Sequence, residues 1–175
     1  NMAIQSYAQL DDVYGKIIMY RSPESLEATP IFYKKSAFDL LFSQHFWLSE
    51  TPDKVSIGWD AKHHRTCTWV ILENKDSGER YVHLNTHLDH MGELARTNGL
   101  ALVLEKAESF DLPVVVTGDF NLYMSDQKGM LNRNIFLPLN GGNGGILALG
   151  ANGIGFPVHF LEQEIQLSAN GTAGG

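Results

Sequence analysis

Short apolar segments separated by turn-forming residues run through most of the chain, and this pattern predicts a protein built mainly of β-strands. The segments are rich in Val, Ile, Phe, Tyr, Trp and Thr, and Gly, Pro, Asn, Asp or Ser lie between them. The predicted strands are 15–20, 31–34, 39–48, 66–73, 80–87 and 112–117. A turn at 74–78 joins two of these strands as a hairpin. Because strands outnumber helices, we expect two packed sheets rather than one doubly wound parallel sheet.

Helical periodicity replaces the strand pattern before the last predicted strand. The apolar residues that recur at the spacing of one helix face are Leu100, Val103, Leu104 and Ala107. We therefore expect a helix over 91–110 on the outside of a sheet, and a short helix end over 5–14. These elements together predict an α/β fold.

The composition changes after Asn134. The remaining residues contain ten of the 17 glycines and no Lys or Arg. We therefore predict one domain over 1–134 and an atypical Gly/Asn-rich tail over 135–175. Segments 140–145 and 150–155 are expected to be linkers, because glycine loses much conformational entropy on ordering. The tail lacks the alternation typical of further sheet strands, although 158–167 could form one strand or a short helix.

Size and charge narrow the classes of function. The 175 residues, 43% of them hydrophobic, suit a globular domain with a sizeable core. The formal net charge of −7 disfavours a broad electrostatic grip on nucleic acid but leaves room for a local basic site. The single cysteine, Cys67, excludes an internal disulfide and a cysteine-built zinc site. No apolar run suggests a membrane span, and nothing in the sequence implies a protein partner.

The N-terminal residues leave the cellular location open. They resemble neither a signal peptide nor a transit peptide, and position 1 is not Met. We expect the chain to begin inside a longer gene product, so the sequence assigns no compartment.

The end of the strand at 112–117 carries a first candidate site. Gly118 lets the chain turn out of the sheet, and extended backbone would project Asp119 and Asn121 together from the carboxyl end of the strand. Open α/β sheets place their chemistry at that end. A carboxylate and a carboxamide offer oxygen ligands to Mg²⁺ or Ca²⁺, and the amide can donate to a phosphate. Asp and Asn are also ordinary turn residues, so this motif alone leaves both interpretations open.

A second cluster lies at the end of the predicted strand 80–87. Alternation puts His83, Asn85 and His87 on one face, with apolar residues on the other. A histidine at such a position can serve as an acid, a phosphate donor or a metal ligand. The alternative is that His87 and His90 only form hydrogen bonds within a loop.

A third cluster precedes the predicted strand 66–73. Arg65 comes directly before the strand, where its guanidinium could donate several hydrogen bonds to a phosphate. His63 and His64 are expected to lie in a solvated loop.

Six motifs in a fixed order make these residues similar to a known family. They lie at 30–34, 46–52, 58–60, 65–69, 85–90 and 117–121, and read PIFYK, FWLSETP, GWD, RTCTW, NTHLDH and TGDFN. The chain resembles the endonuclease/exonuclease/phosphatase superfamily, and more narrowly a bacterial-type branch of metal-dependent phosphoesterases. The resemblance covers about 5–130.

The resemblance implies a DNase I-like two-sheet sandwich with outer helices, incomplete here, in which Mg²⁺ or Mn²⁺ helps water to cleave a phosphate mono- or diester. By position, His87 matches the residue that contacts the scissile phosphate. Asp119 matches the carboxylate that orients the attacking water or a metal, and Asn121 matches its phosphate- or metal-binding neighbour. Arg65 matches a position that contacts phosphate in some members. The implied partner is a phosphoester substrate, either a small molecule or a nucleic acid.

The chain departs from the family pattern at both ends. Members begin with an Asn-bearing strand and a Gln-Glu pair whose Glu is the principal metal ligand, whereas no acidic residue precedes Asp11. Members end with an Asp and a Ser-Asp-His run, for which the tail offers His159 as its one histidine. We therefore expect a fragment truncated at both ends, with impaired catalysis. The alternative is a non-catalytic, vestigial fragment of the same fold.

A zinc hydrolase of the metallo-β-lactamase type is a further alternative. Residues 85–90 resemble its His-x-His-x-Asp-His motif, but Asn85 takes the place of the first histidine. Zinc prefers histidine nitrogen, so this substitution counts against the alternative.

Overall fold

The computed structural model describes residues 11–121, together with the backbone of 135–138 and 144–149. The elements in chain order are β1 (Tyr14–Ile17), β2 (Ile31–Lys34), β3 (Phe38–Trp47), β4 (Thr66–Asn74), β5 (Arg80–His87), α2 (Glu93–Glu108), β6 (Val114–Asp119), β7 (Ile135–Pro138) and β8 (Gly144–Leu149). All six strands expected over 15–117 are present, although β1 is shorter than predicted. The helix expected over 91–110 is confirmed as α2. The helix end expected over 5–14 is wrong for 11–14, which form a turn and the start of β1.

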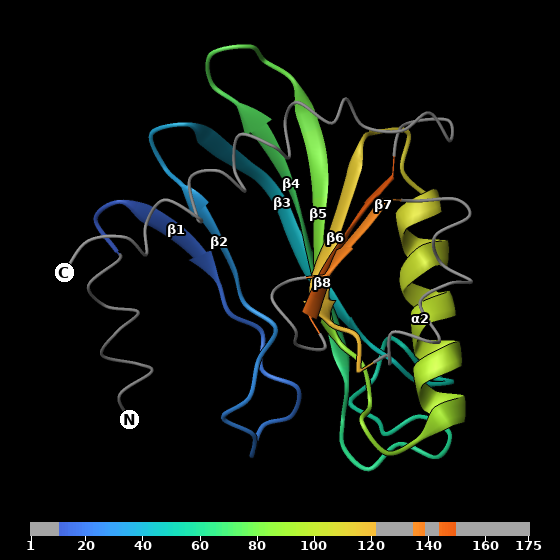
Figure 1. Ribbon diagram of the computed structural model, residues 1–175. Coiled ribbons are helices and arrows are strands. Elements are labelled where there is room, and N and C mark those ends of the chain that lie inside the picture. The colour runs from blue at the N-terminus through green and yellow to red at the C-terminus, as the bar shows by residue number, and fades with distance from the viewer. Residues whose placement is uncertain (1–10, 122–134, 139–143, 150–175) are drawn as a thin grey trace, which may run out of the picture.

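The strands form two sheets, as expected. Six strands form a mixed sheet in the order β3-β4-β5-β6-β8-β7, and β1 and β2 pair as a separate two-stranded sheet. Figure 1 shows α2 along one side of the large sheet and the β1–β2 pair on the other side. The pair β5–β6 is parallel, whereas the other pairs are antiparallel. Parallel pairing requires a crossover between the two strands, and α2 provides it.

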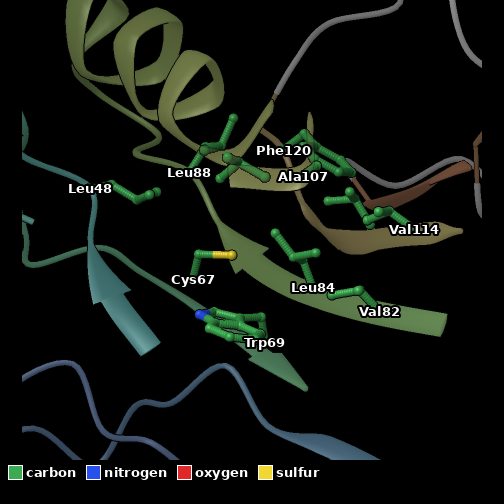
Figure 2. Close-up of a cluster of buried hydrophobic side chains, with 11 residues drawn as sticks. Leu48, Cys67, Trp69, Val82, Leu84, Leu88, Ala107, Val114 and Phe120 are labelled. Atoms are coloured by element: carbon green, nitrogen blue, oxygen red, sulfur yellow. The ribbon is translucent and has the colours of Figure 1, made fainter. Parts of the chain in front are cut away.

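Strand alternation divides the apolar side chains between two cores. In β4, Cys67 and Trp69 belong to the core beneath α2, whereas Val70 and Leu72 pack with Ile31 of β2. Figure 2 shows the core beneath α2, in which side chains from β4, β5 and β6 meet Ala107 of the helix. The large sheet is therefore covered on both faces over these strands, as expected for a two-sheet α/β protein.

Glycine is required where β5 and β6 lie side by side. Gly118 pairs with Thr86 in the parallel register, and a Cβ at Gly118 would collide with the Thr86 backbone. Only glycine lacks this atom. The two strands can therefore run in close register up to their carboxyl ends, where the candidate site lies.

The structure corrects one prediction about the tail. Residues 135–138 and 144–149 were expected to lie in a tail without sheet strands, yet they form β7 and β8, and β8 pairs with β6 along its whole length. Gly144 and Gly145, part of the predicted linker 140–145, begin β8. Ladder hydrogen bonds come from the backbone, so pairing with a central strand outweighs the low strand propensity of glycine. The segments 150–155 and 158–167 lie outside the described residues.

Within the part of the chain that the structure describes, no helix is long and apolar enough to cross a membrane.

Candidate active site

His87 and Asp119 face each other at the carboxyl ends of two parallel strands. They are register partners at the ends of β5 and β6. The Nε2 atom of His87 lies 3.7 Å from Oδ2 of Asp119, and both side chains are partly exposed. This distance is slightly beyond hydrogen-bond range, so the two groups lie in contact without a direct bond. The carboxyl end of the strands, the position predicted for chemistry, therefore carries an imidazole and a carboxylate side by side.

Asn121 joins this pair through a turn rather than through strand alternation. The strand β6 ends at Asp119, and Asn121 has a left-handed backbone with φ 47°. Its backbone N–H donates to Oδ1 of Asp119 over 3.0 Å, and its Nδ2 donates to the Leu88 carbonyl over 2.9 Å. Asn adopts this backbone conformation more readily than most residues. The turn therefore places the Asn121 backbone against the Asp119 carboxylate, and the common projection of the two side chains stays a prediction.

Arg65 reaches the site from the start of β4, whose first residues pair with the end of β5. Its side chain is only 5% exposed. The Nε atom donates to Oδ2 of Asp89 over 3.2 Å, and Nη2 lies 2.9 Å from Nδ1 of His90. Arg65 and Asp119 therefore lie on either side of His87 at one edge of the sheet, and the hydrogen bonds to Asp89 and His90 fix Arg65.

Asp89 is the anchor that sequence reasoning missed. Besides Arg65, it accepts hydrogen bonds from the backbone N–H groups of Met91, Gly92 and Lys62. Burial would raise the pKa of Asp89, but these hydrogen bonds outweigh burial and hold the pKa well below its usual range. The available signal was an Asp shortly before a predicted helix, a common position for a residue that accepts N-terminal N–H bonds.

Asp60, in the motif Gly58-Trp-Asp60, has a structural role at the start of α2. Its carboxylate accepts hydrogen bonds from the backbone N–H groups of Leu94 and Ala95, although it lies more than thirty residues earlier in the chain. The N-cap residue Gly92 makes no side-chain cap itself, and a Cβ there would collide with Asp60. Asp60 therefore caps the helix and fixes the loop that carries Asp89 and His90.

Hydrogen-bonded polar side chains connect β5 and β6 on the face of the large sheet that packs against the β1–β2 pair. The Nε2 atom of His83 lies 2.9 Å from Oγ1 of Thr117, which donates to Oδ1 of Asn85 over 3.1 Å. Asn85 in turn donates to the Pro30 carbonyl over 2.7 Å. Burial lowers the pKa of His83 to about 4, so this imidazole is neutral at pH 7. The predicted face of His83, Asn85 and His87 is confirmed, and Thr117 is a member that sequence reasoning missed.

A small pocket borders His87; we call it the His87 pocket. It is lined by Arg21, Glu27, Ala28, Thr29, His64, Arg65, Thr66 and His87. Its free volume of about 10 Å³ is close to that of one water molecule. His63 and His64 lie in a loop, as predicted, but His64 lines this pocket. His63 stacks on His90 with ring centroids 5.8 Å apart.

The electrostatic surroundings favour a neutral imidazole at His87. Burial is the largest cause that lowers the pKa of His87, and the positive charge of Arg65 acts in the same direction. Asp119 and Glu27 oppose this shift, while Arg21 adds to it. Because the net pKa lies below the ordinary value, the ring is mostly uncharged at neutral pH and carries one N–H donor.

The described residues provide part of a divalent-metal site. Asp119 and Asn121 offer oxygen atoms, the ligand type that Mg²⁺ and Mn²⁺ prefer. Mg²⁺ needs one or two carboxylates and takes its other ligands from water and substrate phosphate, so this pair is compatible with such an ion. Among residues 11–121, no three His, Cys, Asp or Glu side chains gather around a common point. The assignment of Asp119 and Asn121 as metal ligands stays a prediction.

The zinc-hydrolase alternative gains no support from the geometry. Both carboxylate oxygens of Asp89 accept hydrogen bonds from Arg65 and backbone N–H groups, and Nδ1 of His90 contacts Arg65. These contacts hold together the loop before α2, so Asp89 and His90 of the zinc-like motif have structural partners of their own.

Solved structures share this fold. An endonuclease/exonuclease/phosphatase family protein from Bacteroides thetaiotaomicron is 27% identical with a TM-score of 0.71, over 82% of this chain and 64% of that chain. A mannosyl-6-phosphatase from the same species is 30% identical with a TM-score of 0.70, over 81% of this chain and 67% of that one. An endonuclease/exonuclease/phosphatase from Bacteroides vulgatus is 28% identical with a TM-score of 0.72, over 83% and 68%. No family model and no curated protein sequence matches the chain.

The mixed large sheet, the packed second sheet and the outer helix define a DNase I-like α/β protein, as predicted. The chain belongs to the endonuclease/exonuclease/phosphatase family. It spans about two thirds of the length of these family structures. The expected departure from the family pattern at both ends concerns segments that lie mostly outside the described residues, and it stays a prediction.

Proposed function

We propose that this protein hydrolyses a phosphate ester, by attack of a water molecule on phosphorus, with Mg²⁺ or Mn²⁺ as cofactor. The observation that carries the proposal is the 3.7 Å contact of His87 with Asp119 at the carboxyl edge of the sheet, with Arg65 beside it. A donor, a carboxylate and a guanidinium on one edge match the needs of a phosphate group and the water that attacks it.

Asp119 would orient the attacking water. Its Oδ1 atom is fixed by the Asn121 N–H, which leaves Oδ2 directed toward His87. A carboxylate held in this way can accept a hydrogen bond from water and aim its lone pair at phosphorus. The neutral ring of His87 would donate its N–H to a non-bridging phosphate oxygen.

Arg65 and Asn121 would hold the phosphate in place. The bonds from Arg65 to Asp89 and His90 fix the direction of the guanidinium before substrate arrives, so its charge is already placed for the transition state. The bond from Asn121 to Leu88 orients the carboxamide in the same way.

Asp119 and Asn121 would hold the divalent ion. When bound, Mg²⁺ or Mn²⁺ would supply Lewis-acid stabilisation and lower the pKa of a bound water. The substrate is a phosphoester, small or nucleic acid, and the acidic net charge favours a small molecule over duplex DNA.

The test compares the purified chain with Asp119→Asn, using p-nitrophenyl phosphate and bis-p-nitrophenyl phosphate with and without Mg²⁺ or Mn²⁺. We expect metal-dependent turnover that Asp119→Asn lowers by at least about a hundredfold. Asp111→Asn is the matched control, because Asp111 is exposed in the loop before β6 and lies outside the site. If the wild type hydrolyses neither ester faster than buffer alone, the result favours the alternative, a non-catalytic protein of the same fold.

A further inference from the structure

A second arginine lines the His87 pocket, and it belongs to none of the motifs that suggested a site. Arg21 lies in the loop between β1 and β2, and its side chain is only 14% exposed. Its Nε donates to Oγ of Ser25 over 3.1 Å, and its carbonyl accepts a hydrogen bond of 2.8 Å from the Trp47 indole. Both ends of the residue are therefore anchored, and the guanidinium is held against the pocket.

The ion partner of Arg21 is far more exposed than Arg21 itself. The Nη2 atom lies 2.6 Å from Oε1 of Glu27, whose side chain is 60% exposed. An ion pair with so much water around one partner contributes little and exchanges readily. The other arginine of the pocket, Arg65, has a partner that is 1% exposed and held by several further bonds. Of these two cations, Arg21 is the one whose partner a ligand can replace.

We propose that Arg21 binds the phosphoryl group of the substrate, by exchanging Glu27 for a non-bridging phosphate oxygen, and so favours phosphate monoesters over diesters. This inference rests on the proposed function, since it assigns a substrate class to the same site. The His87 pocket has room for about one oxygen-sized group between Arg21, Arg65 and His87.

Charge is the reason for the preference. A monoester is largely dianionic at neutral pH, whereas a diester carries one negative charge. Two guanidinium groups around one phosphoryl group stabilise the second negative charge of the monoester. The diester lacks this second charge, so the second guanidinium stabilises it less. Glu27 repels either anion, so its release from Arg21 is part of binding. The influence of both Arg21 and Glu27 on His87 is consistent with their closeness to the reacting edge.

The experiment measures binding and turnover separately. Inorganic phosphate is titrated into the purified chain by calorimetry in the presence of Mg²⁺, and kcat/KM is measured for p-nitrophenyl phosphate and its bis ester. We expect Arg21→Gln to weaken phosphate binding and monoester turnover by about tenfold or more, and diester turnover by less than about threefold. Glu27→Gln should strengthen phosphate binding by a few fold, because Ser25 still holds Arg21 when the competing carboxylate is gone.

If Arg21→Gln weakens phosphate binding and Glu27→Gln strengthens it, Arg21 acts by binding the ligand. If the ion pair were only structural, both variants would weaken phosphate binding. Lys16→Gln is the matched control, because Lys16 also pairs with an acidic residue, Asp11, but lies outside the pocket. Melting temperatures confirm that each variant is folded.

The outcomes distinguish this inference from the proposed function. Phosphate binding that depends on Arg21, without turnover of either ester, would support the inference and refute hydrolysis. Turnover of both esters with an equal loss in Arg21→Gln would overturn the inference and leave hydrolysis standing. A wild-type chain that does not bind phosphate at millimolar concentration would also overturn it.

Discussion

The Nε atom of Arg65 lies 3.2 Å from Oδ2 of Asp89, and neither side chain is more than 5% exposed. Arg65 directly precedes β4 and Asp89 follows β5, so the two residues flank the open end of the hairpin that these strands form. Their pairing joins the start of β4 to the loop that leads from β5 into α2, beside the candidate active site. A buried ion pair of this kind is costly to break, because the remaining charge has no water around it.

We predict that Asp89→Ala destabilises the fold by about 3–5 kcal/mol, because it leaves Arg65 buried without its carboxylate and removes an acceptor for several N–H groups. Urea unfolding followed by tryptophan fluorescence measures the effect. Asp76→Ala is the control, since Asp76 lies exposed in the β4–β5 turn, and it should change stability by less than about 0.5 kcal/mol. Equal stabilities of the two variants would contradict the role assigned to Asp89.

Gly118→Ala provides a test of the close approach between β5 and β6. The new methyl group would collide with the Thr86 backbone, so the strands must separate or the chain must fail to fold. We expect a loss of at least about 3 kcal/mol in the free energy of unfolding, or insoluble protein.

Gly78→Ala is the matched control for Gly118→Ala. Gly78 has φ 72°, but nothing lies within 4 Å of its missing Cβ. The Gly78→Ala variant introduces backbone strain without a collision, and we expect it to lower the free energy of unfolding by about 1 kcal/mol. A Gly118→Ala protein as stable as the Gly78→Ala protein would show that the two strands have room to adjust.

Local patterns were sufficient to predict β1 to β6 and α2, because each has an apolar pattern of its own. They were also sufficient to predict that His83, Asn85 and His87 share a face, since alternation along β5 fixes that relation. Arg65 lies near His87 because β4 and β5 pair as a hairpin, with the start of β4 beside the end of β5. These relations depend on residues that are close in sequence or on adjacent strands.

The partners that hold the site could not be predicted in the same way. Asp60 accepts hydrogen bonds from the start of α2, and Asp89 accepts them from Lys62 and Arg65 as well as from its own loop. The long-range bonds depend on tertiary packing, which the local sequence does not specify. Arg21 lies in a polar loop without periodicity, so its approach to His87 depends on how β1 and β2 pack on the large sheet. The strand β8 begins with two glycines, and its pairing with β6 is a long-range contact that local strand propensity does not specify.

The buried imidazole of His83 predicts how stability changes with pH. Its pKa of about 4 in the folded chain lies below the ordinary value of about 6.5 for an unfolded chain. Between these values the unfolded chain binds a proton that the folded chain does not, so lowering the pH from about 6.5 to about 4 favours unfolding. Above pH 6.5 both states are neutral at this position and the effect is absent. We expect His83 to account for a loss of roughly 2 kcal/mol over this range, less than the full shift implies because the ring is not wholly enclosed.

The variant His83→Gln isolates that contribution from those of His45 and His87, whose pKa values burial also lowers. Glutamine can still form a hydrogen bond to Thr117 but does not titrate, so the variant should lose less stability than the wild type between pH 6.5 and pH 4. Urea unfolding at a series of pH values in this range measures the difference. His64→Gln is the control, because His64 lines the His87 pocket and takes no part in the chain of bonds along β5 and β6. Parallel stability curves for the wild type and His83→Gln would mean that His83 is protonated as readily in the folded chain as in the unfolded one, and the neutral network with Thr117 and Asn85 would have to be abandoned.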